Sequence, residues 1–149
     1  VSTADALFQE HAAADHELRA LLQQIATEAH TVIRLTALSS EKEPHSTVVA
    51  LAIRRHFAIW AHAGDSRLYF FRGGKLVKRT ADHTYAHHLR SEGKHAEAEI
   101  AQAKYKNILV SALGIAREPQ LMIDEAQDLQ VGDAFLLCSD GLTEMVDDA

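Results

Sequence analysis

The chain has 149 residues, 47% of them hydrophobic and 24% charged, as in an ordinary globular protein with one domain. Its net charge of −6 and the absence of an apolar run of about 18 residues give no support for a nucleic-acid or membrane partner. Cys138 is the only cysteine, which excludes an intrachain disulfide and a cysteine-based zinc site and favours a cytoplasmic protein.

Residues 2 to about 38 are predicted to form a helix. From Leu18 onward, apolar side chains recur at the helical period. The face they form consists of Leu18, Leu21, Leu22, Ile25, Ala29, Val32, Ile33 and Thr36. A one-sided apolar face predicts a helix that covers a sheet. We find no chemistry in this segment and interpret His11, His16 and His30 as surface or boundary residues.

Four β-rich segments follow the loop at residues 39–45. They span residues 47–53, 56–61, 67–71 and 75–78 and are separated by corners at 54–55, 64–66 and 73–74. Connections this short predict an antiparallel meander, because parallel neighbours need long crossovers. The two inner segments are apolar on both faces, so we expect a helix on one side and a second sheet on the other.

The corner at residues 64–66, Gly-Asp-Ser, has two interpretations. In the first it is a hairpin corner, with Asp65 as an ordinary turn residue. In the second, Asp65 is a carboxylate held at the end of two buried strands, where a rigid scaffold could direct it at a metal ion.

The segment from residue 80 to 117 is polar and rich in histidine. Asp82 is predicted to cap a short helix that runs through Leu89 and ends at Gly93, and a second short helix is predicted at about 96–103. His83 and His87 have a spacing that suits a metal, but no third ligand stands at a defining distance, so we do not predict zinc there.

The last segment delivers a second carboxylate. An irregular strand is predicted around 121–129 and a fully apolar, buried strand at 134–138, after which Asp140 stands beside a glycine. A helix is predicted to begin within 143–146. Asp65 and Asp140 therefore share one local design, and strand-end carboxylates around an open cleft suit Mg²⁺ or Mn²⁺.

Five short motifs occupy residues 46–50, 63–69, 80–84, 107–114 and 132–142, and the last two read Asn-Ile-Leu-Val-Ser-Ala-Leu-Gly and Gly-Asp-Ala-Phe-Leu-Leu-Cys-Ser-Asp-Gly-Leu. In this order, the five motifs resemble those of the metal-dependent protein phosphatases, the 2C class of serine/threonine phosphatases, in their bacterial form. The resemblance covers residues 45 to 146. It implies an α+β fold, an antiparallel β-sandwich flanked by helices in αββα layers, incomplete at both ends.

The resemblance also implies a division of the chain as a partial catalytic domain. Residues 1–38 would form a helical layer, 46–79 a strand meander, 80–114 a flap, and 115–149 strands with a metal-site aspartate. The flap, with Asp82, His83 and Thr84, would influence the choice of substrate.

By the same resemblance, the parent protein would hydrolyse phosphoserine and phosphothreonine in phosphorylated protein substrates, using water activated by a pair of Mn²⁺ or Mg²⁺ ions. Asp140 would be a ligand of this pair, and Asp65 would help to hold a third, weaker ion. Arg67 would be structural and brace the turn through charge-assisted bonds. No residue of this chain is assigned as catalytic.

Two metal motifs of the family are absent. Its Asp-Gly-x-Gly-Gly motif would precede residues 1–7, its Gly-x-Asp-Asn motif would follow Ala149, and His45 replaces a usual glycine. We therefore expect the middle of a catalytic domain, inactive alone, with open sheet edges through which copies could associate. The alternative is a non-catalytic binding or regulatory module with a degenerate phosphatase fold.

Overall fold

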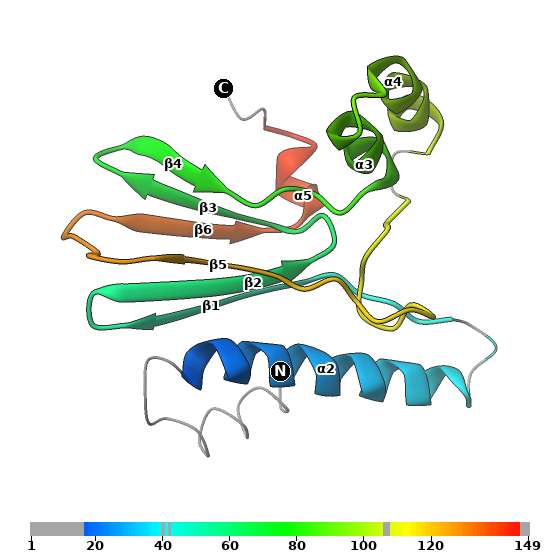
Figure 1. Ribbon diagram of the computed structural model, residues 1–149, viewed down its shortest axis with the longest axis horizontal. Helices are drawn as coiled ribbons and strands as arrows, with labels where there is room; N and C mark the ends of the chain where they lie inside the picture. The colour runs from blue at the N-terminus through cyan, green and yellow to red at the C-terminus, as the bar shows by residue number, and fades with distance from the viewer. Residues whose placement is uncertain (1–16, 40, 42, 106–107, 147–149) are drawn as a thin grey trace.

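Two antiparallel sheets packed face to face form the centre of the computed structural model, which describes residues 17–39, 41, 43–105 and 108–146 (Figure 1). The predicted helical residues 2–16 lie outside the described part. The elements, in chain order, are α2 (Glu17–Ala37), β1 (Val48–Arg54), β2 (Phe57–Ala63), β3 (Arg67–Arg72), β4 (Lys75–Arg79), α3 (Tyr85–Ser91), α4 (His95–Lys104), β5 (Met122–Ala126), β6 (Ala134–Cys138) and α5 (Asp140–Thr143).

Each sheet has three strands, in the orders β1-β2-β5 and β4-β3-β6. The hairpin of β3 and β4 turns at Gly73 and Gly74, whose φ angles of 56° and 73° are those that a two-residue hairpin loop favours. The prediction of a single four-stranded meander is wrong, because β2 and β3 do not pair with each other. β2 pairs with β1 and β5, and β3 pairs with β4 and β6. The corner at residues 64–66 instead carries the chain from one sheet to the other, so the hairpin interpretation of this corner is wrong as well.

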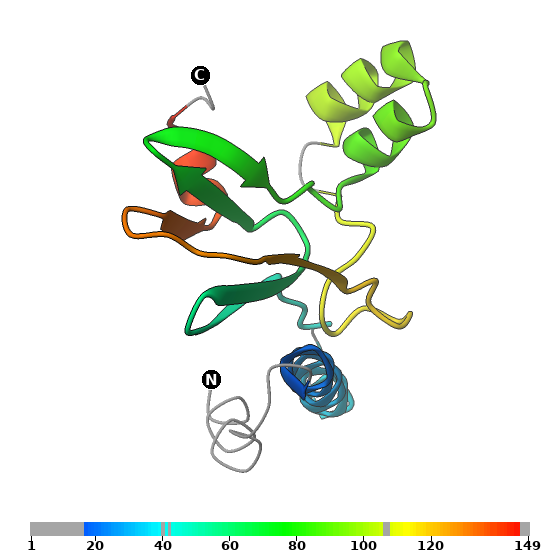
Figure 2. The same cartoon turned by 60° about the vertical axis from the view of Figure 1, so that its left-hand side comes forward.

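The core lies on both faces of β2, as predicted. Ile59 and Ala61 pack against Leu18, Leu21 and Leu22 of α2. On the opposite face, the fully buried side chain of Trp60 packs with Leu68, Phe70 and Ala126 between the two sheets. Figure 2 shows the resulting layers, with α2 beneath the sheet of β1, β2 and β5. The α+β sandwich is therefore confirmed, and in the described residues its helical layer covers this sheet.

The predicted apolar face of α2 holds only in the first half of the helix. Ala26 and His30 are buried farther along, whereas Val32 is 54% exposed. The reason is length: 21 residues of helix reach about 31 Å, so the C-terminal half extends beyond the sheet (Figure 1). There the Nδ1 atom of His30 accepts a hydrogen bond of 3.0 Å from the backbone N–H of Gly114. The interpretation of His30 as a surface or boundary residue is therefore wrong, because its side chain is buried. His11 and His16 lie outside the described residues.

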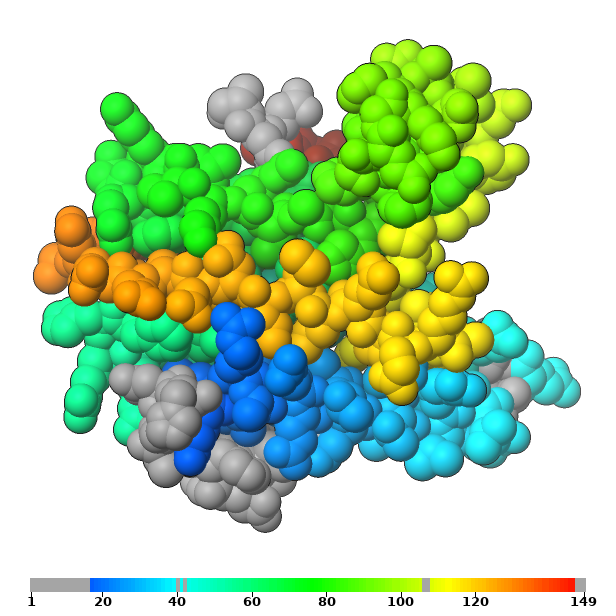
Figure 3. Space-filling view, in the orientation of Figure 1, coloured from blue at the N-terminus to red at the C-terminus, as the bar shows by residue number. Residues whose placement is uncertain are grey.

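The helices α3 and α4 form a lobe beyond one end of the sandwich (Figure 3). They pack through a small cluster of Ala86, Leu89, Ala98 and Ala101. The two predicted helices are confirmed, but the predicted cap is wrong. Thr84, not Asp82, caps α3, since its side chain accepts a hydrogen bond from the backbone N–H of His87. Asp82 forms an ion pair instead.

The last strand and helix also differ from expectation. β6 spans the predicted residues but is an edge strand of its sheet, which leaves Leu136 40% and Leu137 39% exposed rather than buried. The helix α5 starts at Asp140, earlier than predicted, so this carboxylate stands in a helical first turn. Among the described helices, none is both long enough and apolar enough to cross a lipid bilayer.

Candidate functional site

Strand register brings the two strand-end carboxylates together. In the antiparallel pair of β3 and β6, Arg67 lies opposite Cys138. Asp65 precedes Arg67 by two residues and Asp140 follows Cys138 by two, so both leave the sheet at the same end. The sequence predicts that Asp65 and Asp140 each lie at the end of a strand, and the register of β3 with β6 makes them neighbours.

The two carboxylates lie in one cleft of about 250 Å³. The sheet-crossing corner, the start of the flap, the helix α4 and the helix α5 all contribute to its lining. The lining residues are Asp65, Arg67, Asp82, Thr84, Gln102, Asp140, Thr143 and Glu144. Four of these carry carboxylates, so the cleft is acidic and polar.

The corner before Asp65 is shaped by a close backbone approach. Gly64 has a φ of +111°, and a Cβ atom there would lie 2.7 Å from the Cβ of Thr47. Beyond the glycine, the hydroxyls of Thr47 and Ser66 share a hydrogen bond of 2.7 Å. Both contacts hold the corner against the start of β1, and they fix the backbone from which Asp65 projects.

Arg67 joins the corner to the flap. Its guanidinium donates two hydrogen bonds of 2.7 Å to the two carboxylate oxygens of Asp82 and a third, of 3.1 Å, to the hydroxyl of Tyr69. The side chains of Arg67 and Asp82 are only 18% and 20% exposed. The hydrogen bonds to Asp82 raise the pKa of Arg67 above its usual range, so the guanidinium stays charged. The predicted charge-assisted bonds are present, and they brace the flap.

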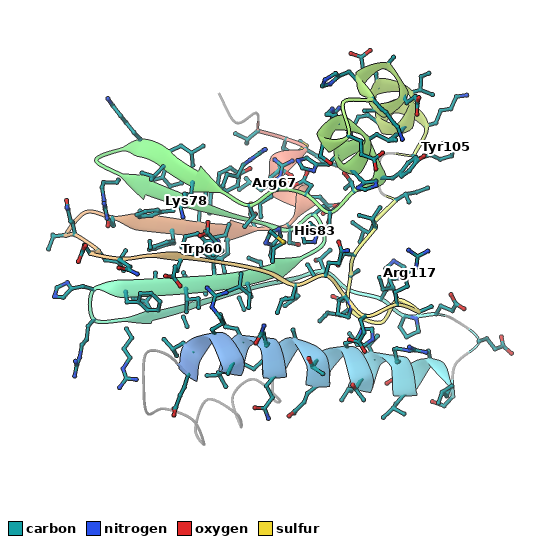
Figure 4. The ribbon with its side chains drawn as sticks, viewed as in Figure 1. Trp60, Arg67, Lys78, His83, Tyr105 and Arg117 are labelled. Atoms are coloured by element: carbon teal, nitrogen blue, oxygen red, sulfur yellow. The ribbon has the colours of Figure 1, made fainter. Side chains whose placement is uncertain are left out.

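Two histidine rings contact each other beside this pair. The ring centroids of His62 and His83 lie 4.5 Å apart at a tilt of 31°, and the Nε2 of His62 donates to the carbonyl of Ala81 at 2.8 Å. The backbone N–H of His83 donates to the carbonyl of Gly64, and the backbone N–H of Gly64 donates to the ring Nδ1 of His83. Burial, with the nearby His62 and His87, lowers the pKa of His83 to about 4, and burial also lowers the pKa of His62. Both rings are therefore neutral near pH 7. Figure 4 shows Arg67 and His83 at the end of the sandwich nearest the flap helices.

The carboxyl of Asp65 has a raised pKa in the cleft. Its pKa is raised, first by burial and then by the charges of Asp140 and Asp82, while Arg67 acts in the opposite direction. Neighbouring carboxylates whose negative charges repel each other also attract a cation, because a cation relieves that repulsion. Glu144, four residues after Asp140, adds a further carboxylate to the lining.

The cleft fits a metal ion only in part. Within the described stretches of the chain, no three or more His, Cys, Asp or Glu side chains are arranged closely enough to hold a metal ion. The oxygen ligands suit Mg²⁺ or Mn²⁺, which keep several waters. The residues therefore fit a cation held by few protein ligands and by water, and they do not supply a full two-metal centre.

Glu144 and Gln102 line the cleft but were missed from the sequence. Starting α5 at Asp140 would have placed Glu144 one helical turn further on the same face. No sequence signal indicates Gln102, because its position depends on how α4 packs against α3. Asp82, His83 and Thr84 lie where the flap meets the sandwich, and Asp82 and Thr84 line the cleft itself.

Comparisons with known proteins relate this chain to a single family. A sequence model of the family described as Protein phosphatase 2C matches residues 1–149. The serine/threonine phosphatase stp of Listeria innocua is 34% identical over 137 residues, which are 89% of this chain and 53% of that protein. The phosphatase PstP of Mycobacterium tuberculosis is 40% identical over 88 residues, 58% of this chain and 16% of that protein.

Solved structures of serine/threonine phosphatases resemble this chain in fold. The S. agalactiae serine/threonine phosphatase superimposes with a TM-score of 0.81 at 28% identity, covering 99% of this chain and 62% of that one. The catalytic domain of PstP in complex with two manganese ions gives a TM-score of 0.70 at 26% identity, with the same coverage. The chain spans about half the length of the first curated relatives that it matches.

Proposed function

The chain belongs to the protein phosphatase 2C family, and on this premise we propose that the whole protein removes phosphate from phosphoserine and phosphothreonine in other proteins. The observation that carries this proposal is the cleft in which the β3–β6 register joins Asp65 and Asp140, at the end of the sandwich where the flap begins. The serine/threonine phosphatases among the relatives support the substrate class.

We propose Mn²⁺ or Mg²⁺ as the cofactor, with Asp140 as a ligand of the metal pair and Asp65, joined by Glu144, holding a third and weaker ion. When bound, the metal pair supplies an activated water and orients the phosphate for in-line attack. The described residues supply too few grouped side chains for the whole metal centre, so they support only a part of it. The relative solved with two manganese ions supports the choice of metal.

The residues of the chain itself position the parts of this site. The corner at Gly64 fixes the backbone from which Asp65 projects, and Arg67 holds the first residues of the flap against the sheet. The flap, residues 80–114, then stands as one wall of the cleft, with Asp82, His83 and Thr84 at its base. We propose that these residues influence substrate choice through the placement of that wall.

We further propose that the 149-residue chain alone has negligible activity and associates through the open edge of β6. In the described part of the chain, β6 pairs only with β3, and its side chains are apolar. We place the parent protein in the cytoplasm, where the thiol of Cys138 would stay reduced. Cell fractionation tests that placement.

Phosphate release from a phosphothreonine peptide by the parent protein tests the function. The proposal predicts release with Mn²⁺, loss on chelation, and a fall in turnover of at least 100-fold in Asp140→Asn, since removing a metal ligand removes the activated water. Asp124→Asn, whose carboxylate bonds Lys78 away from the cleft, is the matched control. A parent without phosphatase activity would favour the alternative, a non-catalytic binding or regulatory module.

A further inference from the structure

Part of the lining of the cleft comes from the flap. Gln102 of α4 and Thr84, which caps α3, line the same cleft as Asp65, Asp140 and Glu144. The hydroxyl of Thr84 already caps α3, and Thr84 is 7% exposed, so little of it remains for a ligand. Gln102 is half-buried, and no hydrogen bond of its amide is found among the described residues. Within the described part of the chain, its amide donors and acceptor are therefore available to a ligand in the cleft.

The chemistry of Gln102 suits a peptide backbone. A carboxamide presents two N–H donors and one carbonyl acceptor, the complement of the acceptor and donor of a main-chain amide. A doubly charged phosphate is matched better by a cation than by a neutral amide. The carboxylates of the cleft therefore suit a cation, which in turn binds the phosphate. The neutral amide of Gln102 suits the peptide chain beside the phosphorylated residue.

The position of Gln102 depends on the start of the flap. Among the described residues, the buried side chains of α4 pack in the alanine-rich cluster that it shares with α3, so α3 and its connection to β4 determine the position of α4. That connection is held at Asp82, whose paired 2.7 Å bonds reach Arg67, two residues from Asp65. Ion pairing at two atoms fixes both distance and orientation. Asp82 thus ties the placement of α4 to the corner that carries Asp65.

We propose that Gln102 contacts the peptide chain beside the phosphorylated residue, and that Asp82, acting through Arg67, is the positioning residue that keeps Gln102 in the cleft. This inference rests on the proposed phosphatase function and adds to it a residue that distinguishes protein substrates from small phosphate esters. Asp82 itself contacts neither substrate nor metal in this account. Its role is to hold the wall at the right distance.

The test compares two substrates of the parent protein, a phosphothreonine peptide of about eight residues and p-nitrophenyl phosphate. Gln102→Ala should lower the ratio of kcat/KM for the peptide to kcat/KM for the ester by about 3- to 10-fold, the range of one or two hydrogen bonds, mainly through the KM of the peptide. Asp82→Asn should lower the same ratio, and the double variant should fall no further than the larger single effect.

Ile100→Ala is the matched control, because Ile100 lies on α4, is 57% exposed and stands about 200° around the helix from Gln102. It should leave the ratio unchanged. Hydrogen exchange gives a readout separate from turnover: amides of residues 95–104 should exchange faster in Asp82→Asn and at the wild-type rate in Gln102→Ala.

Equal losses for both substrates in Gln102→Ala, or no change in the ratio, would overturn the inference while leaving the phosphatase function intact. Wild-type exchange in Asp82→Asn would overturn the positioning role. A wild-type parent that hydrolyses neither substrate would overturn the proposed function, and this inference with it.

Discussion

Gly64 lies so close to Thr47 that a Cβ atom at position 64 would be 2.7 Å from the Cβ of Thr47. This contact holds the end of β2 against the start of β1 at the point where the chain leaves one sheet for the other. Since Asp65 follows directly, the approach of these two residues also determines where the carboxylate points. The corner at Gly64 therefore both joins the two sheets and positions the carboxylate of Asp65 in the cleft.

Gly64→Ala should destabilise the chain by about 2–4 kcal/mol, because an added methyl group overpacks against Thr47 and a side chain is strained at a φ of +111°. Urea unfolding measures the loss. Gly73→Ala is the control: its φ is +56° but nothing lies within 4 Å of the added atom, so only about 1 kcal/mol of backbone strain applies. Equal losses in the two variants would show that the contact with Thr47 carries no energy.

The contacting rings of His62 and His83 predict a pH dependence of stability. His83 has a pKa lowered from 6.5 to about 4, so the unfolded chain binds a proton on this residue between those pH values and the folded chain does not. The free energy of unfolding should therefore fall as the pH drops from 6.5 to 4, with a smaller contribution from His62.

His83→Gln should be less stable than wild type at pH 7, because the ring in contact with His62 and its hydrogen bond from Gly64 are lost, and the difference should shrink toward pH 4. Urea unfolding at several pH values gives both curves. His95→Gln, exposed on α4, should run parallel to wild type. A constant gap between His83→Gln and wild type would rule out a buried neutral ring.

The exposed side chains of β6 predict self-association. Leu136 is 40% exposed on an edge strand whose outer side has no partner among the residues described. Leu136→Lys should shift the chain toward monomer, since a lysine on an edge strand opposes pairing. Light scattering at high concentration detects the change, with Ile100→Lys on the flap as control. A wild-type chain that stays monomeric would contradict the prediction.

The sequence predicted the local elements well, because their signals are local. Paired glycines at 73 and 74 marked a hairpin, Gly93 marked the end of α3, and the apolar run at 134–138 marked β6. Asp65 and Asp140 could be chosen as a pair because both follow apolar strands. Each of these inferences needs only a few neighbouring residues.

What the sequence could not predict depends on distant partners. A short corner reads alike whether the next strand joins the same sheet or the opposite one, so β2 and β3 were placed in one meander. Asp82 looked like a helix cap until Arg67, 15 residues away, proved to be its partner. The packing of α4 that brings Gln102 into the cleft leaves no mark in its own sequence.

The central claim is that Asp65 and Asp140 both bind cations in the acidic cleft, in a site that this chain holds only in part. Titration of the 149-residue chain with Mn²⁺, followed by electron paramagnetic resonance of the free ion, tests it directly. We predict a dissociation constant of roughly 0.1–1 mM, as expected for few charged ligands. Asp65→Asn and Asp140→Asn should each weaken binding at least about five-fold, and Asp124→Asn should match wild type. Sub-micromolar binding, or equal affinity in all four proteins, would contradict this account.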